Sequence, residues 1–143
     1  MNRKLLVFCA VAWVGVLAWG GTVYYLSTMT GSEVEHLLPM KIWDKAAHFM
    51  AFAAGGFLVA TALRFTAGWS WGTIVPVAMM TVSLYGATDE WHQQFTKDRS
   101  SKDVGDWTAD TVGGLAGGLV CGACGFRKRR GVTGPPEDPK LAG

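Results

Sequence analysis

Hydrophobic residues are gathered into four long blocks along this chain, and most charged residues lie between or after the blocks. The blocks are residues 5–26, 46–63, 69–88 and 104–126. The second is interrupted only by His48, and the fourth only by Asp106 and Asp110 near its start. A helix needs about 20 predominantly apolar residues to cross the hydrocarbon core of a bilayer. The pattern therefore predicts an all-α polytopic membrane protein, a bundle of four transmembrane helices at about residues 5–26, 42–63, 69–90 and 104–126.

Composition supports a membrane protein over a soluble helical bundle. Of the 143 residues, 50% are hydrophobic and 17% are charged, whereas an ordinary soluble domain has roughly 25% charged residues. The four blocks also lack the polar outer face that helices of a soluble bundle need. The length allows one domain, which we place at residues 1–130. We expect no nucleic-acid partner. Residues 131–143 are rich in Pro and Gly and are predicted to be a disordered tail.

The first block could also be a secretory signal, because Arg3 and Lys4 precede it. The apolar region of a signal peptide is 7–15 residues long, however, and it ends at a cleavage site of small residues. This block is longer and ends in the bulky run "VYYL". We therefore interpret it as an uncleaved first span.

The distribution of Lys and Arg predicts the orientation. With four spans, both termini lie on one side of the membrane, together with Arg64 and the basic run "RKRR" that follows the last block. Cytoplasmic segments carry an excess of Lys and Arg. We therefore predict a multi-pass protein of the bacterial cytoplasmic (inner) membrane with both termini in the cytoplasm. The loops at 27–43 and 89–103 would then face the extracytoplasmic side.

The densest polar stretch, residues 89–110, lies between two apolar blocks. Ionisable residues within spans are costly and by default indicate function. Asp106 and Asp110 are four residues apart, so they share a helix face, and Gly113 and Gly117 continue it as a G-x-x-x-G pair, which favours close helix packing. Polar residues of the second and third blocks are expected at the same depth. The candidate catalytic residues are His48, Glu90, Asp106 and Asp110, and the candidate substrate-binding residues are Asp44, Lys45, Gln93 and Arg99.

Each of these residues also has an ordinary structural interpretation. Asp44 could cap the second helix, and His48 could be a satisfied interior histidine. The hypothesis of a common site rests on the expected convergence of three helices at one depth.

Four segments together resemble the VanZ-like family of small bacterial membrane proteins. They are "DKAAH", "DEWHQQF", the Arg at position 99 and "DWTADTVGG". The matched positions are Asp44, Lys45, His48, Glu90, Gln93, Phe95, Arg99, Asp106, Asp110 and Gly113. This chain departs from the pattern in having "TKDR" where many relatives have a Pro-Gly turn, and Asp110 where many have Asn. The second departure adds a negative charge. The namesake of the family is associated with resistance to the glycopeptide teicoplanin, which implies a role in the cell envelope.

Three main functions remain open from the sequence; a fourth, a proton or ion pathway, is disfavoured because no charged residue lies in the cytoplasmic halves of the predicted spans. In the first, the polar site binds or modifies a membrane-lipid headgroup or a lipid-linked cell-wall precursor. In the second, the protein is a membrane-embedded enzyme, in which His48 and the carboxylates perform acid–base chemistry or hold a divalent cation while Lys45 and Arg99 hold a phosphate. In the third, the charges form a structural ion-pair network or a surface for a protein partner. The three differ in whether the carboxylates are open to a ligand or fully paired.

Overall fold

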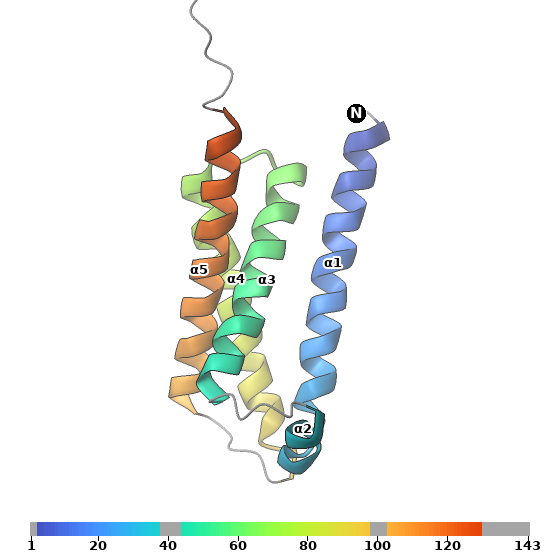
Figure 1. Cartoon of the computed structure of the whole chain (residues 1–143), viewed down its shortest axis with the longest axis vertical. Helices are drawn as coiled ribbons and strands as arrows, with labels where there is room; N and C mark the ends of the chain where they lie inside the picture. The colour runs from blue at the N-terminus through green and yellow to red at the C-terminus, as the bar shows by residue number, and fades with distance from the viewer. Residues whose placement is uncertain (1–2, 38–43, 98–102, 130–143) are drawn as a thin grey trace, which may run out of the picture.

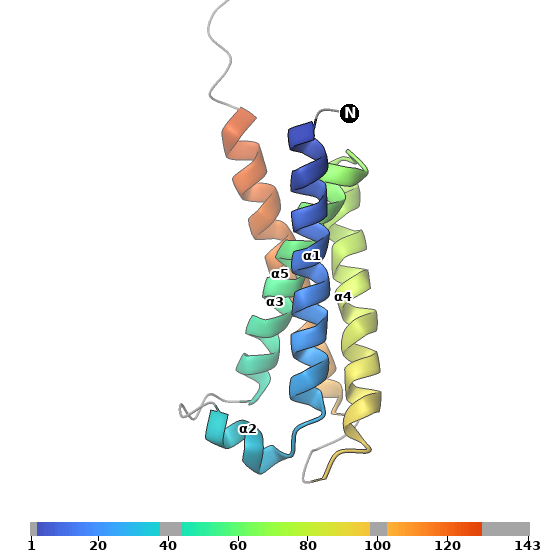
Figure 2. The same ribbon diagram turned by 90° about the vertical axis from the view of Figure 1, so that its right-hand side faces the viewer.

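The computed structural model describes residues 3–37, 44–97 and 103–129. It contains five helices: α1 (Arg3–Ser27), α2 (Gly31–Leu37), α3 (Asp44–Thr66), α4 (Trp71–Gln93) and α5 (Val104–Arg129). No strand occurs among the described residues, so the predicted all-α class is confirmed. The four long helices lie side by side and alternate in direction, with the start of α1 and the end of α5 at the same end of the bundle (Figures 1 and 2).

Two of the described helices, α1 and the Lys45–Thr66 part of α3, are long and apolar enough to cross a membrane. The sequence predicted four such helices, but α4 and α5 are not apolar enough over a membrane-spanning length to be assigned as spans by composition. The physical reason is their composition. α4 contains Asp89, Glu90 and several small or hydroxylated residues, and α5 combines two aspartates with many glycines. The four-span topology therefore stays a proposal.

The helix α2 was not predicted, although its start carries a recognisable signal. The Oγ1 atom of Thr30 accepts a hydrogen bond from the Glu33 backbone N–H at 3.4 Å. The Glu33 carboxylate accepts in return from the Thr30 backbone N–H at 2.8 Å. This reciprocal pair is a capping box, which satisfies backbone groups at a helix start. The hydrogen bonds from the backbone and hydroxyl of Thr30 also lower the pKa of Glu33.

The helices α3 and α5 pack with their backbones in contact, because glycines leave no side chain between them. A Cβ on Gly113 would meet the Phe49 carbonyl of α3, and one on Gly117 would meet the Ala53 carbonyl. The glycine stripe of α5 thus faces α3. Close approach at G-x-x-x-G pairs is a recurrent way to hold helices together where burial from water gives no driving force.

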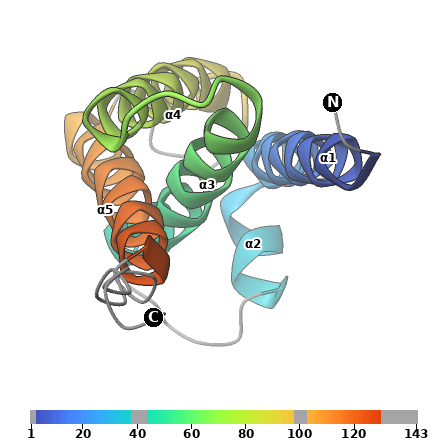
Figure 3. The same ribbon diagram turned by 90° about the horizontal axis from the view of Figure 1, so that it is seen from above.

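The helix α1 lies outside the group formed by α3, α4 and α5 (Figure 3). The Trp19 indole N–H donates to the Ala51 carbonyl of α3 at 2.8 Å, and the Tyr85 hydroxyl of α4 donates to the Gly20 carbonyl at 2.6 Å. A groove of about 660 Å³ lined mainly by residues of α1 and α4 runs beside these contacts. None of the candidate site residues lines this groove.

Candidate functional site

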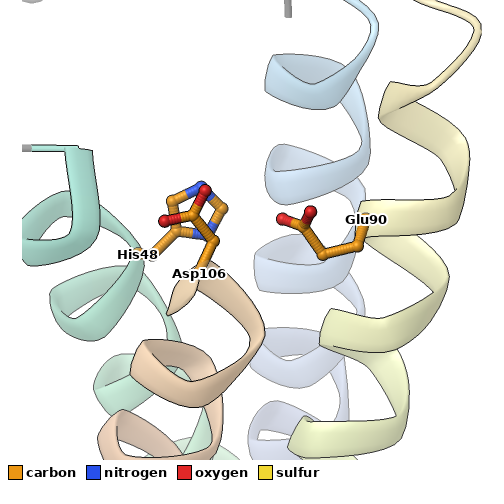
Figure 4. Close-up of side chains that lie close together, drawn as sticks. All are labelled: His48, Glu90 and Asp106. Atoms are coloured by element: carbon orange, nitrogen blue, oxygen red, sulfur yellow. The ribbon is translucent and has the colours of Figure 1, made fainter. Parts of the chain in front are cut away.

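Polar side chains of α3, α4 and α5 meet at the end of the bundle where α3 and α5 begin and α4 ends. His48 comes from α3, Glu90 from α4 and Asp106 from α5 (Figure 4). Each offers one ligand atom to a group whose atoms all lie within 4.8 Å of one another. We call these three residues the polar cluster. His48 and Asp106 are 58 positions apart in the sequence, so the tertiary structure brings the cluster together.

The first turn of α5 positions Asp106 and Asp110. Asp103 precedes the helix, and its Oδ1 atom accepts a hydrogen bond from the Gly105 backbone N–H at 2.7 Å. The Asp103 carbonyl accepts from the backbone N–H groups of Asp106 and Trp107. This is an N-cap, in which an aspartate satisfies backbone donors that the helix leaves open. It fixes where α5 begins and turns Asp106, which is 2% exposed, into the bundle.

Lys45 joins the start of α3 to the start of α5. Its Nζ atom donates to Asp103 Oδ2 at 2.9 Å and to Asp106 Oδ1 at 2.8 Å. The hydrogen bonds from Lys45, and then from the Gly105 N–H, lower the pKa of Asp103. The Lys45 side chain is 32% exposed, so its ammonium lies at the rim of the polar cluster. The structure therefore places this predicted binding residue beside the cluster.

His48 also contacts Asp110, one turn deeper in the bundle. The Nδ1 atom of His48 lies 2.9 Å from Asp110 Oδ1, and Asp110 is fully buried. Gly86 of α4 makes the space, because a Cβ there would lie 2.6 Å from Asp110 Oδ2. That second oxygen has no hydrogen-bond partner among the described residues. Sequence reasoning placed Asp110 in the site but did not foresee the role of Gly86.

Glu90 projects from α4 toward the other members of the polar cluster (Figure 4). Its Oε2 atom accepts a hydrogen bond from the Asp103 backbone N–H at 3.0 Å. The Oε1 atom is buried and has no partner in the described part of the chain. The carboxylate points toward His48 and Asp106 (Figure 4). Within the described residues, the predicted carboxylates are thus neither fully open nor fully paired, since each of Glu90 and Asp110 keeps one buried oxygen for which no partner is found there.

The remaining candidates divide into two groups. Gln93 is 3% exposed and donates to Asp89 Oδ2 at 2.8 Å, one turn back along α4. Asp89 is itself a buried acid that sequence reasoning did not select, although it directly precedes Glu90 in the polar stretch. Arg99 and the side chain of Asp44 lie outside the described residues, so their predicted roles stay predictions.

Comparison with known proteins identifies the family. The family model described as VanZ/LLP1 matches residues 5–125. This chain belongs to the VanZ/LLP1 family. The match confirms the resemblance first suggested by the four segments, and it extends to α1, which those segments do not include. No curated protein and no solved structure matched the chain.

The VanZ/LLP1 match covers the whole polar cluster, all of α3 and α4, and all of α1 and α5 except the first residues of α1 and the last residues of α5. Together with the two strongly apolar helices α1 and α3, it indicates a membrane protein. The polar cluster therefore belongs to the common VanZ/LLP1 region and not to an appended segment.

Proposed function

We propose that this VanZ/LLP1 protein crosses the bacterial inner membrane four times and uses its polar end, on the extracytoplasmic side, to bind or modify a phosphate-bearing lipid headgroup or lipid-linked envelope precursor. A role related to glycopeptide resistance would follow from altered handling of such a precursor. The observation that supports the proposal best is the meeting of buried, incompletely paired carboxylates with Lys45 where three helices converge.

The packing of α4 and α5 supports four spans despite their modest hydropathy. α3 and α4 each have 23 residues and α5 has 26, which corresponds to lengths of about 35–39 Å. They lie alongside one another over these lengths (Figures 1 and 2). Their outward surfaces carry large apolar side chains, including Met80, Leu84, Leu119 and Val120. Such faces suit contact with lipid, while the less apolar residues face other helices.

The topology can be tested with single cysteines in a background where Cys9, Cys121 and Cys124 are replaced by alanine. Lys97→Cys lies just beyond α4 at the polar end, and Ala67→Cys lies in the exposed turn between α3 and α4. We expect an impermeant maleimide to label Lys97→Cys in intact cells and Ala67→Cys only after permeabilisation. The reverse pattern would place the polar end in the cytoplasm. Labelling of both in intact cells would show that α4 does not cross the membrane.

A lysine at the rim of the site suits a phosphate group. The Lys45 ammonium can donate three hydrogen bonds, two of which go to Asp103 and Asp106. The Lys45 side chain is 32% exposed, so an incoming phosphate oxygen can reach its ammonium from the solvent side. Charge-assisted hydrogen bonds between lysine and phosphate are among the stronger polar contacts in proteins. Arg99, outside the described residues, remains the predicted second phosphate ligand.

The headgroup proposal predicts selective binding of lipids that carry a terminal phosphate. We expect purified protein in neutral detergent to bind a polyprenyl phosphate more tightly than the matching polyprenol, as measured by native mass spectrometry or microscale thermophoresis. Phosphatidic acid and diacylglycerol form a second pair that distinguishes a membrane phospholipid from a polyprenyl carrier. Lys45→Gln is expected to weaken binding of the phosphate form roughly tenfold, since one charged contact is lost.

Lys97→Gln is the matched control for this experiment. Lys97 follows α4 at the same end of the bundle and is exposed, and its replacement removes the same charge. We expect that variant to bind like the parent protein. Equal binding of the phosphate and alcohol forms, or equal weakening by the two lysine changes, would contradict a phosphate site at Lys45.

A further inference from the structure

We propose that His48, Glu90 and Asp106 form a binding site for one divalent metal ion of the Mn²⁺ or Zn²⁺ class. The proposal concerns the metal alone and does not require a lipid ligand. It starts from geometry. The three ligand atoms lie within 4.8 Å of one another. Three ligands spread around one ion at about 2.0–2.2 Å lie about 3.3–3.8 Å from one another, so movements of at most about 0.8 Å for each ligand atom bring all three into the first coordination shell.

The unpaired oxygen of Glu90 is an independent indication of a ligand. Glu90 is 5% exposed, and its Oε1 atom is buried without a hydrogen-bond partner among the described residues. The carboxylate is directed at His48 and Asp106 (Figure 4). Leaving a buried carboxylate oxygen unpaired costs free energy, and it costs more in the low-dielectric interior of a bundle. A metal ion bound at Oε1 would remove that cost.

Glu90 and Asp106 are each held by a neighbour through one carboxylate oxygen, and His48 is oriented by Asp110 through Nδ1. Lys45 donates to Asp106 Oδ1, which leaves Oδ2. The Asp103 N–H donates to Glu90 Oε2, which leaves Oε1. An ionised carboxylate can only accept a hydrogen bond, so Asp110 favours the tautomer of His48 that donates from Nδ1 and presents the Nε2 lone pair.

This arrangement has the form of a metal site with its outer shell in place. Histidines that bind metals commonly donate their other ring N–H to a carboxylate, which fixes the ring and its tautomer. Asp110 supplies that carboxylate here, at 2.9 Å from His48 Nδ1. One imidazole with two carboxylates favours ions that accept both nitrogen and oxygen ligands, such as Mn²⁺ or Zn²⁺, over Mg²⁺ or Ca²⁺.

Charge supports the same conclusion. Glu90, Asp106 and Asp110 are all at most 5% exposed. In the part of the chain that the structure describes, the lysine that contacts this group is Lys45, and it already bridges Asp103 and Asp106. Among the described residues, these three carboxylates outnumber the one shared ammonium, so in their ionised form they would leave an excess of negative charge. A divalent ion would neutralise that excess, and it would also give the site the positive charge that a phosphate oxygen needs.

The test is a metal titration without lipid. The protein is purified with a histidine-free tag in the cysteine-to-alanine background, stripped with a chelator and dialysed against Mn²⁺ or Zn²⁺. Bound metal is counted by mass spectrometry, and affinity is measured by calorimetry. We expect about one ion per chain. Glu90→Gln and Asp106→Asn should each weaken binding by more than tenfold, while their helical content stays that of the parent.

Asp89→Asn is the matched control, because it removes the charge of a buried acid one residue from Glu90 whose described hydrogen bond is to Gln93. We expect that variant to bind metal like the parent. Absence of saturable binding to the folded parent protein would overturn the proposal, and that result does not depend on any variant. Equal weakening by Asp89→Asn and Glu90→Gln would also overturn it, since it would show general attraction to negative charge. Lipid binding that fails while metal binding persists would contradict only the headgroup proposal.

Discussion

Replacing Gly117 with alanine is expected to destabilise the bundle strongly, whereas the same change at the neighbouring Gly118 is expected to be tolerated. A Cβ on Gly117 would collide with the backbone of α3 at the Ala53 carbonyl and the Phe57 nitrogen. A Cβ on Gly118 would lie 3.5 Å from the nearest atom of Val75, an ordinary contact distance. Backbone atoms cannot rotate away as a flexible side chain can, so at position 117 the two helices must separate.

The expected size of the effect follows from overpacking. Forcing extra atoms into a well-packed contact typically costs about 1–3 kcal/mol, and we expect Gly117→Ala at the upper end because the obstacle is backbone. Gly118→Ala gains about 1 kcal/mol of helix propensity without this penalty. Reversible unfolding in mixed detergent micelles, followed by circular dichroism, measures both variants. Equal stability of the two would contradict the backbone contact between α3 and α5 at Gly117.

The second large effect is expected at the His48–Asp110 pair. Asp110 is fully buried, and its described hydrogen bond is to His48 at 2.9 Å. Removing the hydrogen-bond partner of a buried carboxylate leaves its charge uncompensated, which typically costs about 3–5 kcal/mol. We therefore expect His48→Leu to unfold far more readily than the parent protein. The measurement is made with a chelator present, so that metal binding does not contribute.

A double-mutant cycle separates the charge from the loss of packing. Asp110→Asn alone is expected to be mild, because an amide oxygen can still accept from His48 and many relatives in the resemblance carry Asn there. In the Asp110→Asn background, His48→Leu should cost less than in the parent, with a coupling of about 2 kcal/mol. Additive effects would show that Asp110 does not depend on His48. Contacts other than the one with His48 would then stabilise the buried Asp110 carboxylate.

The helices and the shared face of the site residues were predictable because local spacing determines them. An uncharged apolar run as long as residues 5–26 favours a membrane-spanning helix. A separation of four residues places Asp106 and Asp110 on one helix face whatever the helix packs against. The glycine spacing of α5 likewise predicted a close helix contact, which the structure locates at Phe49 and Ala53. The family also followed from short segments, because each keeps a fixed spacing.

The partners within the site were not predictable, because they depend on how each helix is rotated and offset against its neighbours. Lys45 could have contacted any of several acids by sequence, and packing of α3 against α5 decided on Asp103 and Asp106. Gln93 was expected in the binding site, but the described contact is with Asp89 on its own helix. The prediction that α4 and α5 also cross the membrane stays a prediction, because the residues that lower their hydropathy leave only α1 and α3 apolar enough to be assigned by composition.

The sequence by itself determined the helical class, the family and which residues can reach the polar end, since these follow from composition and from the repeat of the helix. Only the tertiary structure decided that His48, Glu90 and Asp106 converge, and that Glu90 and Asp110 each keep a buried oxygen with no hydrogen-bond partner among the described residues. Convergence depends on the contacts at Gly86, Gly113 and Gly117 that set how closely three helices approach. A glycine in a sequence shows that close approach is permitted, but the rest of the packing decides which backbone or side chain occupies the space.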